Sequence, residues 1–243
     1  MDHALYKASF EGSDLPLAGT SCLLAISVGR DYHEGARLAA AVDLINRRGF
    51  AFCTVGVGDT LQRHNMPSGS MVERHAAAAR AGREWLARNR EILARIAVPT
   101  TTVTWDDYIG DPRYGGLRER VETAYRLNED YRNAIEATIE IFLERAASRG
   151  EAIDRGAIAE RCRRYILEEA PVIMPLWAEE GHDYILYPQR MTPAMAHTRA
   201  LFVATTRPTK AQWLPIKFKK RAPTIGVSAP SAPLPLQTGG RAA

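Results

Sequence analysis

Short apolar runs alternate with longer amphipathic stretches along the N-terminal half of the chain. The runs Cys22–Ile26, Phe50–Val57 and Val98–Trp105 have the length and composition of buried strands. Amphipathic segments at His33–Arg48 and Met71–Ala97 lie between them and predict helices. Because strands and helices alternate at short spacing, the pattern predicts an α/β fold with a parallel sheet and crossover helices.

The next part of the chain has a helical pattern with few breaks. Three helices are predicted there, at Leu117–Leu127, Glu129–Ser148 and Asp154–Glu169. Asp154 is the expected N-cap of the last helix, and Pro171 is expected to end it. Apolar runs at Val172–Trp177 and Asp183–Tyr187 then predict a fourth and a fifth strand. We therefore expect one Rossmann-like domain with a parallel sheet of about five strands and a helical insertion.

Composition sets the expected boundaries of this domain. A chain of 243 residues with 46% apolar content can bury one sizeable core. We expect a Rossmann-like domain at 21–221, preceded by an N-terminal arm at 1–20. The segment 222–243 is rich in Pro, Ser, Gly and Ala, which predicts a disordered tail. No signal peptide or membrane-spanning run is recognised, so the expected location is cytoplasmic, without a membrane partner.

Charge is unevenly distributed along the chain. From Tyr184 onward there are nine cations and no acid, which leaves 23 cations against 28 acids in the preceding residues. This asymmetry indicates a partner with a phosphate backbone or an acidic surface, or else a solvated basic tail. The three cysteines are widely spaced and are expected to be reduced thiols rather than zinc ligands.

Polar residues follow the predicted strands where a parallel sheet would bind a ligand. Ser27, Asp59 and Asp106 come after the first three strands, and Tyr187 closes the fifth. Ser27 lies on a turn before a glycine, which suits a nucleophile, an anion site or simply a loop closure. A G-x-S-x-G elbow is absent, and the six histidines have neither metal-ligand nor triad spacing.

Two further sets of residues have spacings that point to a site. Tyr165 and Glu169 are four residues apart on one helix face, where they could hold an ammonium group, although Glu168 is adjacent. The helix after the second strand is rich in arginine, which suits phosphate but also simple solubility. Its candidate phosphate-binding residues are Arg74, Arg80, Arg83, Arg88 and Arg90.

Taken in order, these motifs resemble those of the cyclodipeptide synthases, relatives of the catalytic domain of class I aminoacyl-tRNA synthetases. The string Leu24–Gly29 is similar to the family's nucleophile segment, and Asp59-Thr60 to its acidic loop. Tyr165–Pro171 matches the family's Tyr-x-x-x-Glu-x-Pro segment, and Tyr187-Pro188 its catalytic-loop tyrosine. The resemblance covers residues 20 to 220.

Departures within the motifs refine this resemblance. One subfamily has Asn where this chain has Arg30, and Tyr-His where it has Tyr187-Pro188, so the chain resembles the other, Tyr-Pro subfamily. Ala25 replaces a glycine that many members have, which affects the first aminoacyl pocket. The synthetase signatures His-Ile-Gly-His and Lys-Met-Ser-Lys-Ser are absent, so no use of ATP is expected.

The resemblance implies a reaction and a role for each residue. Two aminoacyl-tRNAs would supply the two halves of a diketopiperazine through aminoacyl- and dipeptidyl-Ser27 intermediates, without a cofactor or a metal. The implied catalytic residues are Ser27, Tyr165, Glu169 and Tyr187. The implied substrate-binding residues are Ala25, Gly29, Arg30, Asp59 and Pro188. The arginine helix would bind tRNA, and backbone amides near Ser27 and Gly29 would stabilise the oxyanion.

Two alternatives remain open at this point. A non-catalytic tRNA-binding module with a synthetase-like fold would use the basic residues but give Ser27 no role. A serine ester hydrolase would use Ser27 without tRNA. The two amino acids that the enzyme would join are left open by the sequence.

Overall fold

The computed structural model describes residues 5–12, 15–148 and 154–221, so the predicted tail at 222–243 lies outside the described residues. One six-stranded sheet runs through them in the order β1-β6-β5-β2-β3-β4. The strands are β1 (Tyr6–Phe10), β2 (Ser21–Ser27), β3 (Phe52–Gly58), β4 (Thr100–Thr104), β5 (Tyr184–Tyr187) and β6 (Gln212–Lys220). All neighbours pair in parallel except β1, which is antiparallel to β6. The predicted α/β class with a mostly parallel sheet is confirmed.

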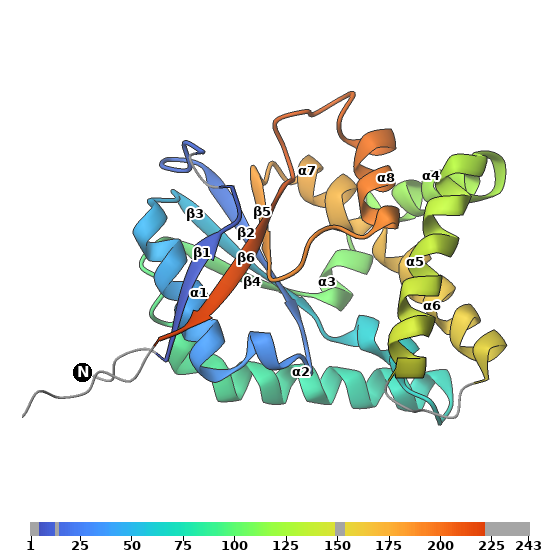
Figure 1. Cartoon of the computed structure of the whole chain (residues 1–243), viewed down its shortest axis with the longest axis horizontal. Helices are drawn as coiled ribbons and strands as arrows, with labels where there is room; N and C mark the ends of the chain where they lie inside the picture. The colour runs from blue at the N-terminus through green and yellow to red at the C-terminus, as the bar shows by residue number, and fades with distance from the viewer. Residues whose placement is uncertain (1–4, 13–14, 149–153, 222–243) are drawn as a thin grey trace, which may run out of the picture.

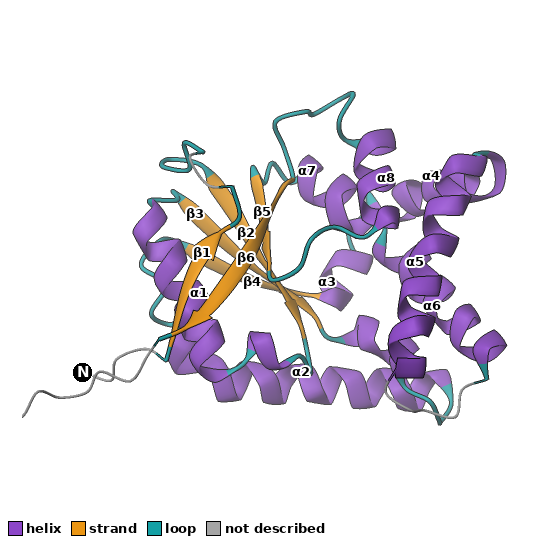
Figure 2. Ribbon diagram, viewed as in Figure 1, coloured by secondary structure: helices purple, strands orange, loops and turns teal. Residues whose placement is uncertain are grey.

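Helices cover both faces of the sheet (Figures 1 and 2). They are α1 (Gly35–Arg48), α2 (Met71–Leu93), α3 (Trp105–Ile109), α4 (Tyr114–Leu127), α5 (Glu129–Ser148), α6 (Arg155–Glu169), α7 (Trp177–Glu179) and α8 (Pro193–Phe202). Short 3-10 turns, η1 (Asp31–His33) and η2 (Thr60–Asn65), follow β2 and β3. Helices α4, α5 and α6 correspond to the expected helical insertion, and they share an apolar core with α8, which the sequence pattern missed.

Strand β2 divides its side chains between the two faces, because successive residues of a strand point in opposite directions. Cys22, Leu24 and Ile26 join the core formed with α1 and Trp85 of α2. Leu23 and Ala25 join the second core, which includes residues of α3 and α7. Ser27 is two residues beyond Ala25, so its side chain points to the same face as that second core.

Local signals fix where the helices begin. Ser70 caps α2, and Glu73 returns a hydrogen bond to the Ser70 amide, a reciprocal capping box. The predicted N-cap Asp154 accepts a hydrogen bond of 3.1 Å from the Ala157 amide at the start of α6. Among the described helices, none is both long and apolar enough to cross a membrane.

Three strand assignments need correction. Val172–Trp177, predicted as a strand, is an irregular helical segment, η3 (Val172–Leu176), that leads into α7. Pro175 and the positive φ of Met174 are incompatible with a regular strand, and burial on all sides had given the segment its strand-like composition. The sequence pattern missed β6, whose Pro215 and exposed lysines weaken the apolar alternation. It also missed β1, which lies in the segment 1–20 expected to be an arm.

Candidate active site

The carboxyl end of β2 meets the carboxyl end of β5 at the nucleophile candidate. Ser27 is the last residue of β2, and Gly29, with a φ of +86°, turns the chain toward η1. Because β5 is the parallel neighbour of β2, its last residue, Tyr187, ends at the same edge. The Ser27 Oγ and the Tyr187 Oη are 3.0 Å apart, which is hydrogen-bonding distance.

One pocket collects all four predicted catalytic side chains. The space between its walls, with open solvent at the mouth included, is about 420 Å³. Ser27, Tyr165, Glu169 and Tyr187 all line it, together with Ala25. Aromatic and aliphatic side chains make up most of the remaining wall, namely Leu61, Trp105, Tyr108, Ile173, Trp177, Met195 and Trp213. Such a cavity suits an apolar ligand with a few polar groups at its reactive end.

A second tyrosine extends the hydrogen bond from the serine. The Tyr32 Oη is 3.0 Å from the Tyr187 Oη, so three hydroxyls form a continuous chain from Ser27 to Tyr32. Burial raises the pKa of Tyr187 well above its usual range, and the neighbouring Tyr32 raises it further. Tyr187 is therefore a neutral phenol that can both donate and accept. Sequence reasoning missed Tyr32, because it lies in a three-residue turn whose side-chain direction no periodicity defines.

His33 lies beside the serine without serving as its base. The Ser27 amide donates a hydrogen bond of 2.9 Å to the His33 Nδ1, and the same ring nitrogen is 3.3 Å from the Ser27 carbonyl oxygen. Burial lowers the pKa of His33 to about 4, which keeps the ring neutral. The Ser27 Oγ bonds to Tyr187 instead, so the arrangement is not a hydrolase triad. The expectation of an oxyanion donor at Ser27 is corrected, since its amide is already occupied.

Tyr165 and Glu169 lie together on the pocket wall, as their spacing on α6 predicts. Burial raises the pKa of Glu169 to about 8, and a hydrogen bond from Tyr165 opposes the rise. Burial also raises the pKa of Tyr165, with a further contribution from the Glu169 charge. Of the described residues that line the pocket, only Glu169 has an ionisable carboxyl or a basic group. An ammonium group in the pocket would therefore meet a single carboxylate.

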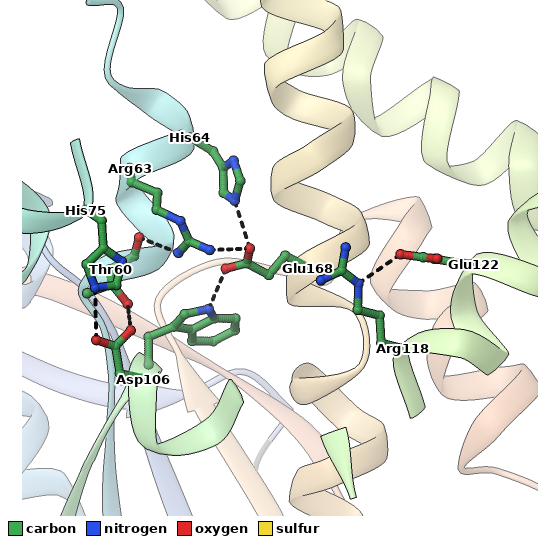
Figure 3. Close-up of polar contacts among 9 residues, drawn as sticks. Thr60, Arg63, His64, His75, Asp106, Arg118, Glu122 and Glu168 are labelled. Carbon is green, nitrogen blue, oxygen red and sulfur yellow. Dashed lines mark hydrogen bonds and ion pairs between the residues drawn. The ribbon is translucent and has the colours of Figure 1, made fainter. Parts of the chain in front are cut away.

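The adjacent Glu168 does not line the pocket, and its carboxylate has partners on other elements of the fold (Figure 3). Its Oε2 is 2.5 Å from the Arg63 Nη2 and 2.9 Å from the His64 Nε2. The Trp105 indole N–H donates to the Oε1 at 2.9 Å. Burial raises the pKa of Glu168, but these partners outweigh it and hold the pKa below its ordinary value. The choice between the two glutamates is thus decided: Glu168 anchors α6, and Glu169 faces the pocket.

Asp59 also has a structural position, which corrects its expected place in the substrate pocket. Its Oδ1 accepts a hydrogen bond of 3.0 Å from the Trp105 amide, and it does not line the pocket. A Cβ on Gly82 of α2 would lie 2.5 Å from the Asp59 side chain, so α2 packs directly against this carboxyl. Asp106 is held in the same region: its carboxylate accepts a hydrogen bond of 2.6 Å from the Thr60 hydroxyl and lies 3.2 Å from the His75 Nε2 (Figure 3).

The other expected substrate-binding residues lie around the mouth rather than in the wall. Gly29 and Arg30 are exposed, and Pro188 is half-buried next to Tyr187. None of the three lines the pocket. The Arg30 charge nevertheless acts on Tyr165, since it counters the rise in the pKa of that phenol.

The predicted phosphate-binding arginines divide into two groups on α2. Arg80, Arg83 and Arg90 are exposed and form no ion pair with any residue that the structure describes. Arg88 pairs with Glu34 at 3.0 Å, and the half-buried Arg74 donates to the Met66 carbonyl at 3.3 Å. The first three arginines are therefore free to contact a phosphate backbone.

Comparison with solved structures finds similar proteins over most of the chain. A cyclodipeptide synthase (CDPS) from Fluoribacter dumoffii has 34% sequence identity and a TM-score of 0.84, covering 89% of this chain and 99% of that chain. A cyclodipeptide synthase from Candidatus Glomeribacter gigasporarum, bound to Phe-tRNAPhe, has 20% identity and a TM-score of 0.68, covering 90% and 96%.

A third structure links the fold to the synthetases. This Mycobacterium tuberculosis protein, described as demonstrating that cyclodipeptide synthetases are related to type I tRNA synthetases, has 15% identity and a TM-score of 0.62, covering 91% and 96%. The two more distant matches support the fold alone, whereas the first spans nearly the whole of both chains. No protein-family model and no curated protein sequence matches.

The two adjacent glutamates should affect stability in opposite directions. The folded protein retains the Glu169 proton up to a pKa of about 8, whereas the unfolded chain loses it near 4.5. Glu169 therefore lowers stability progressively as pH rises from about 4.5 to 8. We expect Glu169→Gln to stabilise the fold at pH 8 by on the order of 2 kcal/mol or more, with little effect at pH 4, in urea unfolding.

Glu168→Gln is the matched control one residue away. Glu168 contributes stability above its unfolded pKa that is lost as pH falls through its lowered folded pKa. The substitution should destabilise the fold at pH 8 by about 3 kcal/mol, because Arg63 keeps a buried charge without its partner. Equal effects of the two substitutions at pH 8 would contradict this assignment.

Proposed function

Because this chain belongs to the cyclodipeptide synthase family and is accordingly an aminoacyltransferase, we propose that it joins aminoacyl groups from two aminoacyl-tRNAs into a diketopiperazine through Ser27 esters. The observation that carries this proposal is the pocket in which the Ser27 hydroxyl, bonded to Tyr187 at 3.0 Å, shares its lining with Glu169. A nucleophile, a proton carrier and an ammonium partner are thus present in one cavity. The second candidate, a serine hydrolase, lacks a basic residue on the Ser27 hydroxyl.

The first step would transfer the aminoacyl group to the enzyme. The Ser27 Oγ attacks the ester carbonyl of aminoacyl-tRNA, and the bond from that carbon to the ribose oxygen breaks. The serine proton passes through Tyr187 to the departing ribose oxygen, so no net charge is created. The aminoacyl ester is already activated, which is why the step consumes no ATP. The exposed Gly29 amide, with no hydrogen bond to any described residue, is the remaining candidate donor to the oxyanion.

Glu169 would hold the amino group of the bound aminoacyl moiety. The pKa of Glu169, about 8, is close to that of an α-amino group, which is typically about 7.7–8.0. A neutral amine entering beside a protonated carboxyl can take its proton and form an ion pair without exchange with solvent. The ammonium charge then lowers the pKa of Glu169, and the Tyr165 hydroxyl supplies a second contact.

The remaining steps would use the same hydroxyls. The amine of a second aminoacyl-tRNA attacks the Ser27 ester, which frees the serine and leaves a dipeptidyl-tRNA. Ser27 attacks that ester in turn, forming dipeptidyl-Ser27 and releasing the second tRNA. The free amine of the dipeptide then closes on the Ser27 ester to give the six-membered ring. Tyr187 takes the amine proton and returns one to the Ser27 oxygen in this cyclisation.

The arginines on α2 support a role in holding tRNA. Arg80, Arg83 and Arg90 are exposed on one helix, and such contacts to phosphate are independent of RNA sequence. The similar cyclodipeptide synthase bound to Phe-tRNAPhe is consistent with such a substrate. Arg30 and the Tyr187-Pro188 pair further support membership of the Tyr-Pro subfamily.

The acyl-serine intermediate gives the direct test. When the protein is mixed with a full set of aminoacyl-tRNAs, quenched and digested, we expect peptide mass spectrometry to show an aminoacyl adduct on the peptide that contains Ser27. Ser27→Ala should remove both the adduct and the diketopiperazine. Ser21→Ala, which alters a serine of the same strand outside the pocket, should retain the adduct. Product formation by Ser27→Ala would refute the proposed intermediate, and tRNA binding without product in the wild type would favour a non-catalytic module.

The hydroxyl chain predicts a role for Tyr32. Tyr32→Phe removes the link from Tyr187 toward solvent and should slow adduct formation about tenfold, whereas Tyr187→Phe should slow it about a hundredfold. Single-turnover rates with one aminoacyl-tRNA would measure both. Tyr6→Phe on β1 is the control, with a hydroxyl outside the pocket lining. If Tyr32 only supports the fold, the loss in rate should be accompanied by lower thermal stability, and the dependence of rate on pH should not change.

The arginine helix predicts a salt-dependent loss of affinity. Replacing Arg80, Arg83 and Arg90 by Gln should weaken tRNA binding about tenfold or more at low salt and reduce the slope of log Kd against log salt by about 2 to 3. Filter binding at several salt concentrations would measure this. Arg155→Gln, whose guanidinium already pairs with Glu140 at 2.8 Å, is the control and should leave the slope unchanged. An unchanged slope in the triple variant would exclude this helix as the tRNA site.

A further inference from the structure

Two polar atoms in the pocket wall have no hydrogen-bond partner among the described residues. They are the Tyr108 hydroxyl oxygen and the Trp177 indole nitrogen, and both are fully buried. Tyr108 is 1% exposed and Trp177 is 2% exposed, and both residues line the cavity that contains Ser27. A buried donor without a partner lowers the stability of the fold. Such a donor in the wall of a binding cavity therefore indicates that the ligand supplies the acceptor.

The two atoms belong to one local cluster. The Tyr108 and Trp177 rings are 5.9 Å apart between centroids, with an interplanar angle of 64°. The Tyr108 oxygen is also held close to the backbone of β3, since a Cβ on Gly56 would lie 2.9 Å from it. Burial raises the pKa of Tyr108 well above its usual range, and the neighbouring Trp177 indole only partly opposes that rise, so the phenol keeps its proton. The pocket therefore contains two adjacent N–H and O–H donors in fixed positions.

The rest of the wall limits what can satisfy these donors. The other two indoles of the described pocket lining already have partners: that of Trp105 donates to Glu168, and that of Trp213 donates to the Gln189 carbonyl. Away from Glu169 the described lining has no ionisable side chain other than tyrosine, so an acidic side chain would be buried without a cation. A lysine or arginine side chain has no acceptor to offer. A hydrocarbon side chain would leave both donors without a partner.

We propose that the aminoacyl group transferred to Ser27 has a neutral side chain with an oxygen acceptor, a hydroxyl or a carboxamide, that is bound by Tyr108 and Trp177. An oxygen with two lone pairs can accept from the indole N–H and the phenol O–H together. The inference rests on the proposed function, because it assigns the substrate class of that same pocket. Discrimination of this kind is strong, since a site built to bond a polar group rejects the analogue that lacks it.

Rates of Ser27 acylation with matched pairs of aminoacyl-tRNAs test the inference. The pairs are serine with alanine, threonine with valine, tyrosine with phenylalanine, and asparagine or glutamine with leucine. We expect the fastest substrate of the whole set to be one of the polar members and to exceed its apolar partner at least tenfold in kcat/KM. Tyr108→Phe and Trp177→Phe should lower that ratio severalfold by slowing the polar substrate, with little effect on the apolar one.

Tyr114→Phe is the matched control. The Tyr114 hydroxyl is also buried without a described partner, but Tyr114 does not line the pocket. Its substitution should leave the ratio unchanged. A fastest substrate with a hydrocarbon side chain, or a ratio that Tyr108→Phe and Trp177→Phe do not alter, would overturn the inference. Absence of a Ser27 adduct with every aminoacyl-tRNA would instead refute the proposed function, so the two failures are distinguishable.

Discussion

The buried carboxylate of Glu168 is the contact on which the active-site geometry depends. It joins α6 to η2 through Arg63 and His64 and to the start of α3 through the Trp105 indole, all within 2.9 Å. Tyr165 and Glu169 are on the same helix, so this anchor sets their distance from the sheet edge that carries Ser27. A buried carboxylate is unfavourable unless it is fully paired, and here three donors from two other elements pair it. The fold thus accepts one buried charge, and that charge positions the carboxyl group of Glu169.

Adjacent glutamates on one helix can have opposite properties because they project about 100° apart. Glu168 points into donors, which lower its pKa, and Glu169 points into a pocket of aromatic walls, which raise its pKa to about 8. On the other side of the pocket, the hydroxyls of Ser27, Tyr187 and Tyr32 form a continuous chain that can pass protons. The pocket therefore separates a chargeable wall, suited to an ammonium, from a neutral wall, suited to acyl transfer.

The sequence predicted correctly those features that depend on hydrophobic periodicity and on where the strands end. Apolar runs located β2, β3 and β4, and the parallel topology then brought Ser27 and Tyr187 to one edge. The four-residue spacing of Tyr165 and Glu169 placed both on one helix face. The pattern failed where tertiary packing decides. Asp59 also follows a strand, but the close approach of Gly82 buries it, and Val172–Trp177 is apolar because it is enclosed rather than because it is a strand. Tyr32, Tyr108 and Trp177 become recognisable only when separate elements meet.

The pocket has several unfavourable features that a substrate can relieve. Glu169 is half-buried without a cation, and two donors of the inner wall lack acceptors within the described part of the chain. Replacing these groups by apolar ones would make the free protein more stable, so the fold gives up stability at this site. A ligand that supplies both an ammonium and an acceptor recovers that free energy as binding energy. An amino acid linked to tRNA through its carboxyl group presents its ammonium and its side chain at once. The unpaired carboxyl and donors of the pocket therefore indicate the chemistry of the aminoacyl group in more detail than the sequence motifs do.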